Sequence, residues 1–118
     1  MAFKRVDRVK ALLQRELGQL ISEELTDPRI AFATVTEVDV TPDLRTARVH
    51  VSVLGSEEER GATLQALERA KRHLRRALGE RTDLRLVPEL AFVEDRSAER
   101  AARIATLLRE AGRDKPEP

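Results

Sequence analysis

The stretch IAFATVTEVDVTPDLRTARVHVSVLGSEEE, residues 30 to 59, decides the fold. Its first part, Ile30 to Val40, is rich in β-branched residues and ends in alternating apolar and acidic residues, which predicts a strand. Val35 interrupts the alternation, which predicts a bulge or burial on both faces there. Thr41-Pro42-Asp43 predicts a turn, and the clean alternation from Ala47 to Val53 predicts a second, half-buried strand. We expect the two strands to pair as an antiparallel hairpin.

A helix follows the hairpin. Gly55 ends the second strand, and Ser56 and Glu59 have the spacing of a capping box, in which each side chain bonds the backbone of the other. Apolar residues then recur at helical spacing, and Gly79 is the expected stop. The expected buried stripe consists of Leu64, Leu67, Ala70, Leu74, Ala77 and Leu78.

The flanking segments complete the pattern. Phe3 to Leu25 has the periodicity of an amphipathic helix, which Asp27-Pro28 should end. Leu84 to Phe92 predicts a third strand, with an edge or a local break at Pro88. Ser97 should cap a last helix, with Gly112 at its end. One side of that helix is expected to carry Ala101, Ile104, Leu108 and Ala111.

The expected order is therefore helix, strand, strand, helix, strand, helix. This order predicts an α+β fold with the helices packed on one face of a small three-stranded sheet. We expect one domain over residues 1–112 and a disordered tail over residues 113–118, which has charges and prolines but nothing to bury.

Composition narrows the function. The chain has 118 residues, 41% hydrophobic and 36% charged, which is typical of a globular protein with a charged exterior. It has no cysteine, which excludes disulfides, thiolate metal sites and a cysteine nucleophile. Charges interrupt the first apolar stretch, and no window approaches the roughly 20 apolar residues of a membrane span. We expect a cytoplasmic protein without membrane contact.

The net charge of +1 hides two basic segments. Lys4 to Arg15 has five basic residues against one acidic residue, and Arg69 to Arg85 has seven against two. Two basic segments on an otherwise acidic chain favour a surface that binds a polyanion, although charge alone fits a merely solvated helix face equally well. On a helical wheel, Arg69, Arg72 and Arg76 lie opposite the apolar stripe.

The sequence contains no recognisable motif for catalysis or for binding a metal or cofactor. His50 and His73 have no ligand-type partner at helical spacing, and there is no phosphate-binding glycine loop or nucleophile elbow. We therefore expect no enzyme activity, no metal and no cofactor. The three phenylalanines sit in apolar register, so nucleic acid should be bound through phosphates and shape, with little base stacking.

Several motifs together resemble the bacterial ribosome-binding factor A family. They are Asp27-Pro28-Arg29, Thr41-Pro42-Asp43-Leu44 leading to Ala47-x-Val49-x-Val51, Leu84-Arg85-Leu86-Val87-Pro88-Glu89-Leu90-x-Phe92, and Asp95-Arg96-Ser97. The resemblance covers nearly the whole chain and implies a type II KH-like fold without its usual Gly-x-x-Gly loop, which this sequence also lacks. Members often kink the crossover helix at Ala-x-Gly. Here the matching residues are Ala70-Lys71-Arg72, which leaves one bent helix or two open.

The resemblance also implies a function. Such proteins bind the free 30S subunit, act near helix 1 and the neck of 16S rRNA, assist late maturation at its 5′ end, and are linked to cold adaptation. We expect a monomer that contacts rRNA phosphates through a basic helical face. The candidate RNA-binding residues are Lys4, Arg5, Arg8, Arg15, Arg69, Lys71, Arg72, Arg75, Arg76, Arg81 and Arg85.

Three other functions remain open at this point. A KH-like module for other RNAs is disfavoured by the missing Gly-x-x-Gly loop, which clamps single strands. A protein–protein adaptor would use the basic helix only as a solvated face. An RNA-processing enzyme is remote, because the sequence offers no metal site or acid–base pair.

Overall fold

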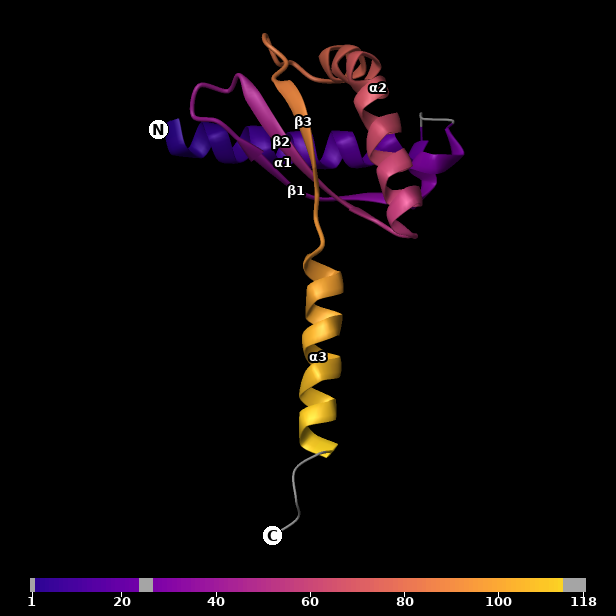
Figure 1. Cartoon of the computed structure of the whole chain (residues 1–118). Helices are drawn as coiled ribbons and strands as arrows, with labels where there is room; N and C mark the ends of the chain where they lie inside the picture. Colours follow the sequence, from indigo (N-terminus) through magenta and orange to yellow (C-terminus); the bar gives the residue numbers. More distant parts are fainter. Residues whose placement is uncertain (1, 24–26, 114–118) are drawn as a thin grey trace.

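The computed structural model describes residues 2–23 and 27–113, which form three α-helices, one 3-10 helix and a three-stranded sheet (Figure 1). Its elements are α1 (Ala2–Glu23), η1 (Pro28–Phe32), β1 (Ala33–Val40), β2 (Thr46–Val53), α2 (Glu57–Arg81), β3 (Glu89–Glu94) and α3 (Ser97–Arg113). The α+β class and the order of helices and strands are confirmed. No helix of the described residues is long and apolar enough to cross a membrane.

The sheet has the order β1-β2-β3, with β2 in the centre. β1 pairs antiparallel with β2, and β3 pairs parallel with β2. The register between β1 and β2 shifts between Val35 and Glu37, so the predicted irregularity beside Val35 is confirmed as a bulge. The turn between the strands places Leu44 at φ 62°, in the left-handed region.

One face of the sheet carries the core. Ala47, Val49, Val51 and Val53 of β2 are buried, while the alternating residues of the strand point to the other face. Both long helices cover the buried face, because their leucines belong to the same core cluster as the β2 valines. The fully buried leucines are Leu13, Leu17 and Leu20 of α1 and Leu67, Leu74 and Leu78 of α2.

α2 starts at the predicted capping box. Ser56 Oγ accepts a hydrogen bond from the Glu59 amide at 3.2 Å, and Glu59 Oε1 accepts one from the Ser56 amide at 3.0 Å. The helix is one unbroken element of 25 residues, and its two ends run in different directions in Figure 1, so it is bent. Gly79 does not end it, because the helix continues to Arg81 and closes on Thr82.

Two strand predictions need correction. Residues 30–32 belong to η1 and not to a strand, because Asp27 caps this short 3-10 helix by accepting from the Arg29 amide. β3 begins only at Glu89, after Pro88, which has no backbone N–H to donate to a sheet. Residues 84–88 therefore form a loop, in which Leu86 is 61% exposed.

α3 projects away from the rest of the chain (Figure 1). Every residue from 97 to 112 is exposed, so the prediction that all helices pack on the sheet is wrong for this helix. At the start of this helix, Asp95 Oδ1 accepts a hydrogen bond from the Ser97 amide at 2.8 Å. The helix passes Gly112 and ends at Arg113, while residues 114–118 of the expected tail lie outside the described residues.

Candidate nucleic-acid interface

The exposed side of α2 presents arginines because its other side is filled by the core. Thr63, Ala66, Leu67, Leu74, Ala77 and Leu78 are buried along one stripe. Arg69, Arg72 and Arg76 are exposed, as the helical wheel predicted. The positions of these three arginines follow from helical periodicity alone.

Four basic residues of α2 line a hollow against the start of β3. This α2–β3 hollow has a volume of about 340 Å³ and is lined by Lys71, Arg72, Arg75, Arg76, Glu89 and Leu90. Four cations stand there against one carboxylate. Three of the four are arginines, whose planar guanidinium suits the bidentate binding of a phosphate.

Arg75 also has a structural role. Its Nε donates to the Pro88 carbonyl at 3.2 Å and its Nη2 donates to the Val87 carbonyl at 3.0 Å. These two bonds hold the end of the loop that leads into β3. Arg75 therefore shapes the hollow in addition to lining it.

Arg81 is engaged between the two long helices. Its Nε donates to Glu16 Oε2 at 2.9 Å and its Nη2 donates to Gln19 Oε1 at 2.7 Å. Both partners lie in the C-terminal half of α1, so Arg81 ties the C-terminal end of α2 to that half of α1. These two hydrogen bonds give Arg81 a role in helix packing.

Arg5 and Arg85 come together in a second hollow. It has a volume of about 370 Å³, and its lining includes both arginines, the exposed Leu86 and two carboxylates, Asp43 and Asp83. Two arginines against two carboxylates leave this hollow without excess charge, unlike the α2–β3 hollow. Pro88 lines it while giving its carbonyl to Arg75, so the end of the 84–88 loop lies between the two hollows.

The remaining candidates are dispersed. Arg8 and Arg15 are exposed on α1, and Arg15 Nε lies 3.7 Å from Glu16 Oε1. Lys71 Nζ lies 2.6 Å from Glu68 Oε2, an ion pair one turn away on the same helix. The side chain of Lys4 lies outside the described residues. Among the described residues, basic side chains therefore gather most densely on α2.

The Asp-Pro-Arg motif has a structural explanation. Arg29 binds Asp27 through both ends of its guanidinium, with Nε to Oδ1 at 3.0 Å and Nη2 to Oδ2 at 2.8 Å. These hydrogen bonds hold the pKa of Asp27 below its usual value, and the charge of Arg69 adds a smaller effect in the same direction. The Arg29 carbonyl accepts from Thr63 Oγ1 at 2.7 Å, which ties η1 to α2.

Sequence spacing missed one polar cluster on the outer sheet face. Glu37, Asp39 and His50 place potential ligand atoms within 4.8 Å of one another, because β1 and β2 are paired there. His50 Nε2 lies 3.1 Å from Asp39 Oδ2, and Lys10 Nζ lies 3.6 Å from Asp39 Oδ1. Lys10 offsets part of the charge of the two carboxylates, and exposed acidic groups commonly lie together without an ion, so this cluster does not carry a metal assignment.

The chain is similar to known proteins over most of its length. A family model described as ribosome-binding factor A matches residues 5–108. Ribosome-binding factor A of Roseiflexus castenholzii is 48% identical over 113 residues, which cover 95% of this chain and 87% of that protein. The protein of the same name from Desulfitobacterium hafniense is 49% identical over 109 residues, with 92% and 87% covered.

Solved structures share the fold. The crystal structure of ribosome-binding factor A from Thermus thermophilus matches with a TM-score of 0.69 at 35% identity, over 78% of this chain and 97% of that one. A homology model of the Thermus thermophilus protein, fitted into a cryo-EM map of its complex with 30S, matches with a TM-score of 0.57 at 38% identity, over 75% and 97%.

Proposed function

Because the chain belongs to the ribosome-binding factor A family, we propose that it binds the free 30S ribosomal subunit and assists late maturation of 16S rRNA. The proposed maturation step includes processing at the 5′ end, with contacts near helix 1 and the neck. The protein acts in the cytoplasm as a binding factor without catalysis and supports growth in the cold. The relative fitted into a 30S complex map supports the choice of subunit.

The α2–β3 hollow is the observation that carries the mechanism. Its four cations and single carboxylate can neutralise neighbouring phosphates of one RNA backbone, with release of condensed counterions. Arg69 extends the same exposed side of α2. Phosphate contacts position a protein without reading sequence, so the specificity for one rRNA region comes from the shape of the folded RNA.

The contacts of the candidate residues support a division of roles among them. Arg69, Arg72 and Arg76 are exposed and reach phosphates directly, and Lys71 exchanges Glu68 for a phosphate. Arg75 and Arg81 act mainly by holding the loop before β3 and the contact between the helices. Arg5, Arg8, Arg15 and Arg85 contribute secondary contacts.

The test is cosedimentation of the purified protein with free 30S, 50S and 70S particles over a salt series. Each phosphate contact contributes about 0.7–0.9 to the slope of log affinity against log salt concentration. The triple variant with Arg69, Arg72 and Arg76 changed to Glu should lose binding to 30S and keep the circular dichroism spectrum. The matched control Arg48→Glu changes an exposed arginine on the outer sheet face and should bind 30S like the wild type.

Three results would contradict the proposal. Undiminished 30S binding by the folded triple variant would remove the α2 surface from the mechanism. Binding that does not respond to salt would favour a protein–protein adaptor. Equal binding of short single-stranded RNA would favour a general RNA-binding module.

A further inference from the structure

The hollow that contains Arg5 and Arg85, called the Arg5–Arg85 hollow below, has the composition of a ligand pocket. Its volume of about 370 Å³ lies at the small end of the range for ligand pockets, about 300–1,000 Å³. Five of its nine lining residues are apolar, namely Val9, Leu44, Leu84, Leu86 and Pro88. Leu86 is exposed at the rim, and the other four are buried or half-buried. The hollow therefore has an apolar floor that rests on the hydrophobic core.

Three segments that are far apart in the sequence form this hollow, and hydrogen bonds fix two of them to each other. The segments are the start of α1, the turn between β1 and β2, and residues 83–88. The Glu89 amide donates to the Arg45 carbonyl at 2.8 Å, which joins the turn to the start of β3. Arg75 of α2 holds two carbonyls of the 83–88 segment. The hollow is therefore preformed, so a ligand that enters it pays little for ordering the protein.

The charged groups at the rim have unused hydrogen-bonding capacity. Within the part of the chain that the structure describes, the side chains of Arg5, Asp83 and Arg85 form no hydrogen bond or ion pair. Asp43 Oδ1 accepts from Thr41 Oγ1 at 2.6 Å and from the Arg45 amide at 3.1 Å. These bonds hold the pKa of Asp43 below its usual value. The rim thus offers two arginine donors and a second carboxylate, that of Asp83, with both oxygens unbonded.

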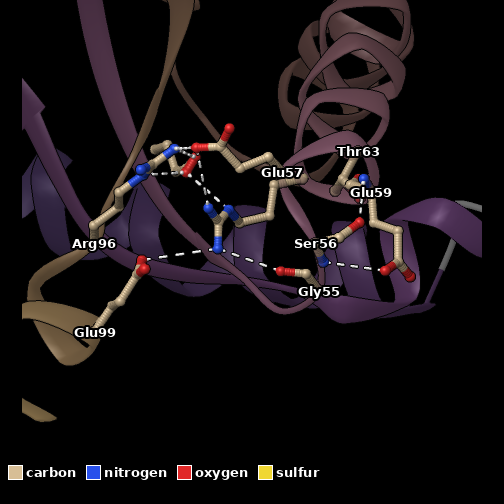
Figure 2. Close-up of polar contacts among 9 residues, drawn as sticks. Gly55, Ser56, Glu57, Glu59, Thr63, Arg96 and Glu99 are labelled. Atoms are coloured by element: carbon tan, nitrogen blue, oxygen red, sulfur yellow. Dashed lines mark hydrogen bonds and ion pairs between the residues drawn. The ribbon is translucent and has the colours of Figure 1, made fainter. Parts of the chain in front are cut away.

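A charged hollow at the base of α3 shows the contrast, because its charged groups bind one another. This hollow has a volume of about 390 Å³. Arg60 Nη1 lies 3.8 Å from Glu99 Oε2, and Arg96 Nε lies 2.9 Å from Glu94 Oε2. Figure 2 shows Arg96 and Glu99 on either side of this network. The fold itself uses these charges, whereas the rim of the Arg5–Arg85 hollow leaves its charges to a ligand.

We propose that the Arg5–Arg85 hollow binds one unpaired guanine of the RNA, an inference that rests on the proposed function for the identity of the macromolecule. The hollow adjoins the cationic α2–β3 hollow, because Pro88 lines the first and its neighbours Glu89 and Leu90 line the second. A charge-balanced apolar pocket beside a cationic one matches a nucleic-acid strand, whose bases are neutral and whose phosphates are anionic. Unpaired bases of RNA are recognised in this way, by hydrogen bonds to their edges. The guanine contact adds base readout to the phosphate contacts of α2.

Guanine is the base whose donors and acceptors match this rim. Its acceptors O6 and N7 suit the two-pronged guanidinium of an arginine. Its adjacent donors N1–H and N2–H₂ suit the two oxygens of one ionised carboxylate. Asp83 is that carboxylate, because Asp43 Oδ1 is already engaged. Adenine and cytosine each have one amino group without an adjacent second donor, and uracil has a single N–H. The exposed Leu86 packs on the face of the bound base.

Titration with mononucleotides, followed by nuclear magnetic resonance, tests the pocket without the ribosome. Because one base gives only millimolar affinity, guanosine 5′-monophosphate (GMP) is added up to about 10 mM. The amide signals of Leu44 and Leu86 should shift, and the dissociation constants for AMP, CMP and UMP should be at least about 5-fold higher. All four nucleotides carry the same phosphate, so the difference reports the base. Inorganic phosphate should shift the signals of Arg72 and Arg76 and leave those of Leu44 and Leu86 unchanged.

The variant Asp83→Asn tests the carboxylate. It replaces one accepting oxygen by a donor and should weaken GMP binding at least about 5-fold while leaving AMP binding unchanged. The matched control Asp7→Asn changes an exposed aspartate of α1 that does not line the hollow. Residues two positions apart on a helix do not face each other, so Asp7 points away from Arg5 and its variant should bind GMP like the wild type. Both aspartates are exposed, so both variants should stay folded.

Chemical probing with kethoxal extends the test to the 30S subunit, because this reagent modifies N1 and N2 of unpaired guanine. The wild-type protein should protect a guanine of 16S rRNA from modification. Asp83→Asn should still cosediment with 30S and should lose that protection, while Asp7→Asn should keep it.

Three results would overturn the guanine pocket. They are the absence of GMP-induced shifts at Leu44 and Leu86, equal affinity for GMP and AMP, and a guanine protection pattern that Asp83→Asn leaves unchanged. Failure of the wild-type protein to cosediment with 30S would instead contradict the proposed function. The GMP titration would then still decide whether the pocket exists, so the two failures are distinguishable.

Discussion

Replacing Arg81 by Met should destabilise the protein while sparing its binding to the subunit. The substitution keeps most of the apolar stem of the side chain and removes the guanidinium that bonds Glu16 and Gln19 of α1 at 2.9 and 2.7 Å. Hydrogen bonds to charged groups are worth about 1.5–3 kcal/mol each. The Arg81 side chain is 30% exposed and that of Glu16 13%, so solvent screening reduces the total to about 1–2 kcal/mol.

This loss is measurable by urea unfolding and by thermal melts followed by circular dichroism. A loss of 1–2 kcal/mol corresponds to a fall in Tm of about 4–8 °C for a domain of this size. A double-mutant cycle with Glu16→Gln should give a coupling of about 1 kcal/mol. Arg76→Met is the matched control, because Arg76 is exposed on the same helix. Arg76→Met should lower the free energy of unfolding by less than about 0.5 kcal/mol and should weaken 30S binding.

The opposite result would refute the division of roles between the two arginines. That result is an Arg81→Met variant with the stability of the wild type, a coupling to Glu16 below about 0.3 kcal/mol, and a loss of 30S affinity equal to that of Arg76→Met. Arg81 would then belong to the RNA-binding surface, as its charge alone first suggested.

Three further outcomes can be measured in the same unfolding experiments. Leu67→Ala should lower the free energy of unfolding by about 2–5 kcal/mol, because Leu67 is fully buried in the core. A smaller decrease would mean that the core collapses around the cavity. Ser56→Ala should lower the free energy of unfolding by about 1 kcal/mol, because it removes the cap of α2. An unchanged midpoint of urea unfolding would contradict this capping role. Hydrogen bonds from Thr36 and Ser97 lower the pKa of Asp95 to about 2 from an ordinary value of 3.8. The stabilisation from Asp95 is therefore complete above its unfolded pKa and lost as the pH falls through about 2. Asp95→Asn should accordingly flatten the decline in stability between about pH 5 and 2, and an unchanged acid profile would argue against this carboxylate.

The arginines of α2 show which features depend on neighbouring residues and which depend on contacts between residues far apart in the sequence. Arg69, Arg72 and Arg76 were placed correctly by helical periodicity, because a helix with one apolar stripe must expose its other side. The charge of Arg81 looked equivalent in the sequence. Its partner Glu16 is 65 residues away, and no local pattern reports such a contact.

The same distinction explains the fold predictions. The hairpin, the bulge beside Val35 and the capping box at Ser56 depend on residues close together in the chain, so sequence alone determined them. The local break predicted at Pro88 is confirmed, but the predicted start of the third strand at Leu84 is wrong. Leu84 and Leu86 have strand-like composition, whereas the pairing partners that define β3 lie on β2. Strand limits depend on such distant partners, and propensity does not contain them.

α3 shows most clearly what the sequence alone does not predict. Its periodic apolar residues correctly predicted an amphipathic helix, because the period of 3.6 residues is a property of the local backbone. Periodicity says which side of a helix is apolar and not what covers that side. Only the tertiary structure, through the contacts of Arg60 and Arg96 at the base of the helix, decided that the stripe faces away from the core. The same holds for Glu37, Asp39 and His50, which meet across two paired strands, because proximity between distant residues is created by folding and is absent from the chain before it folds.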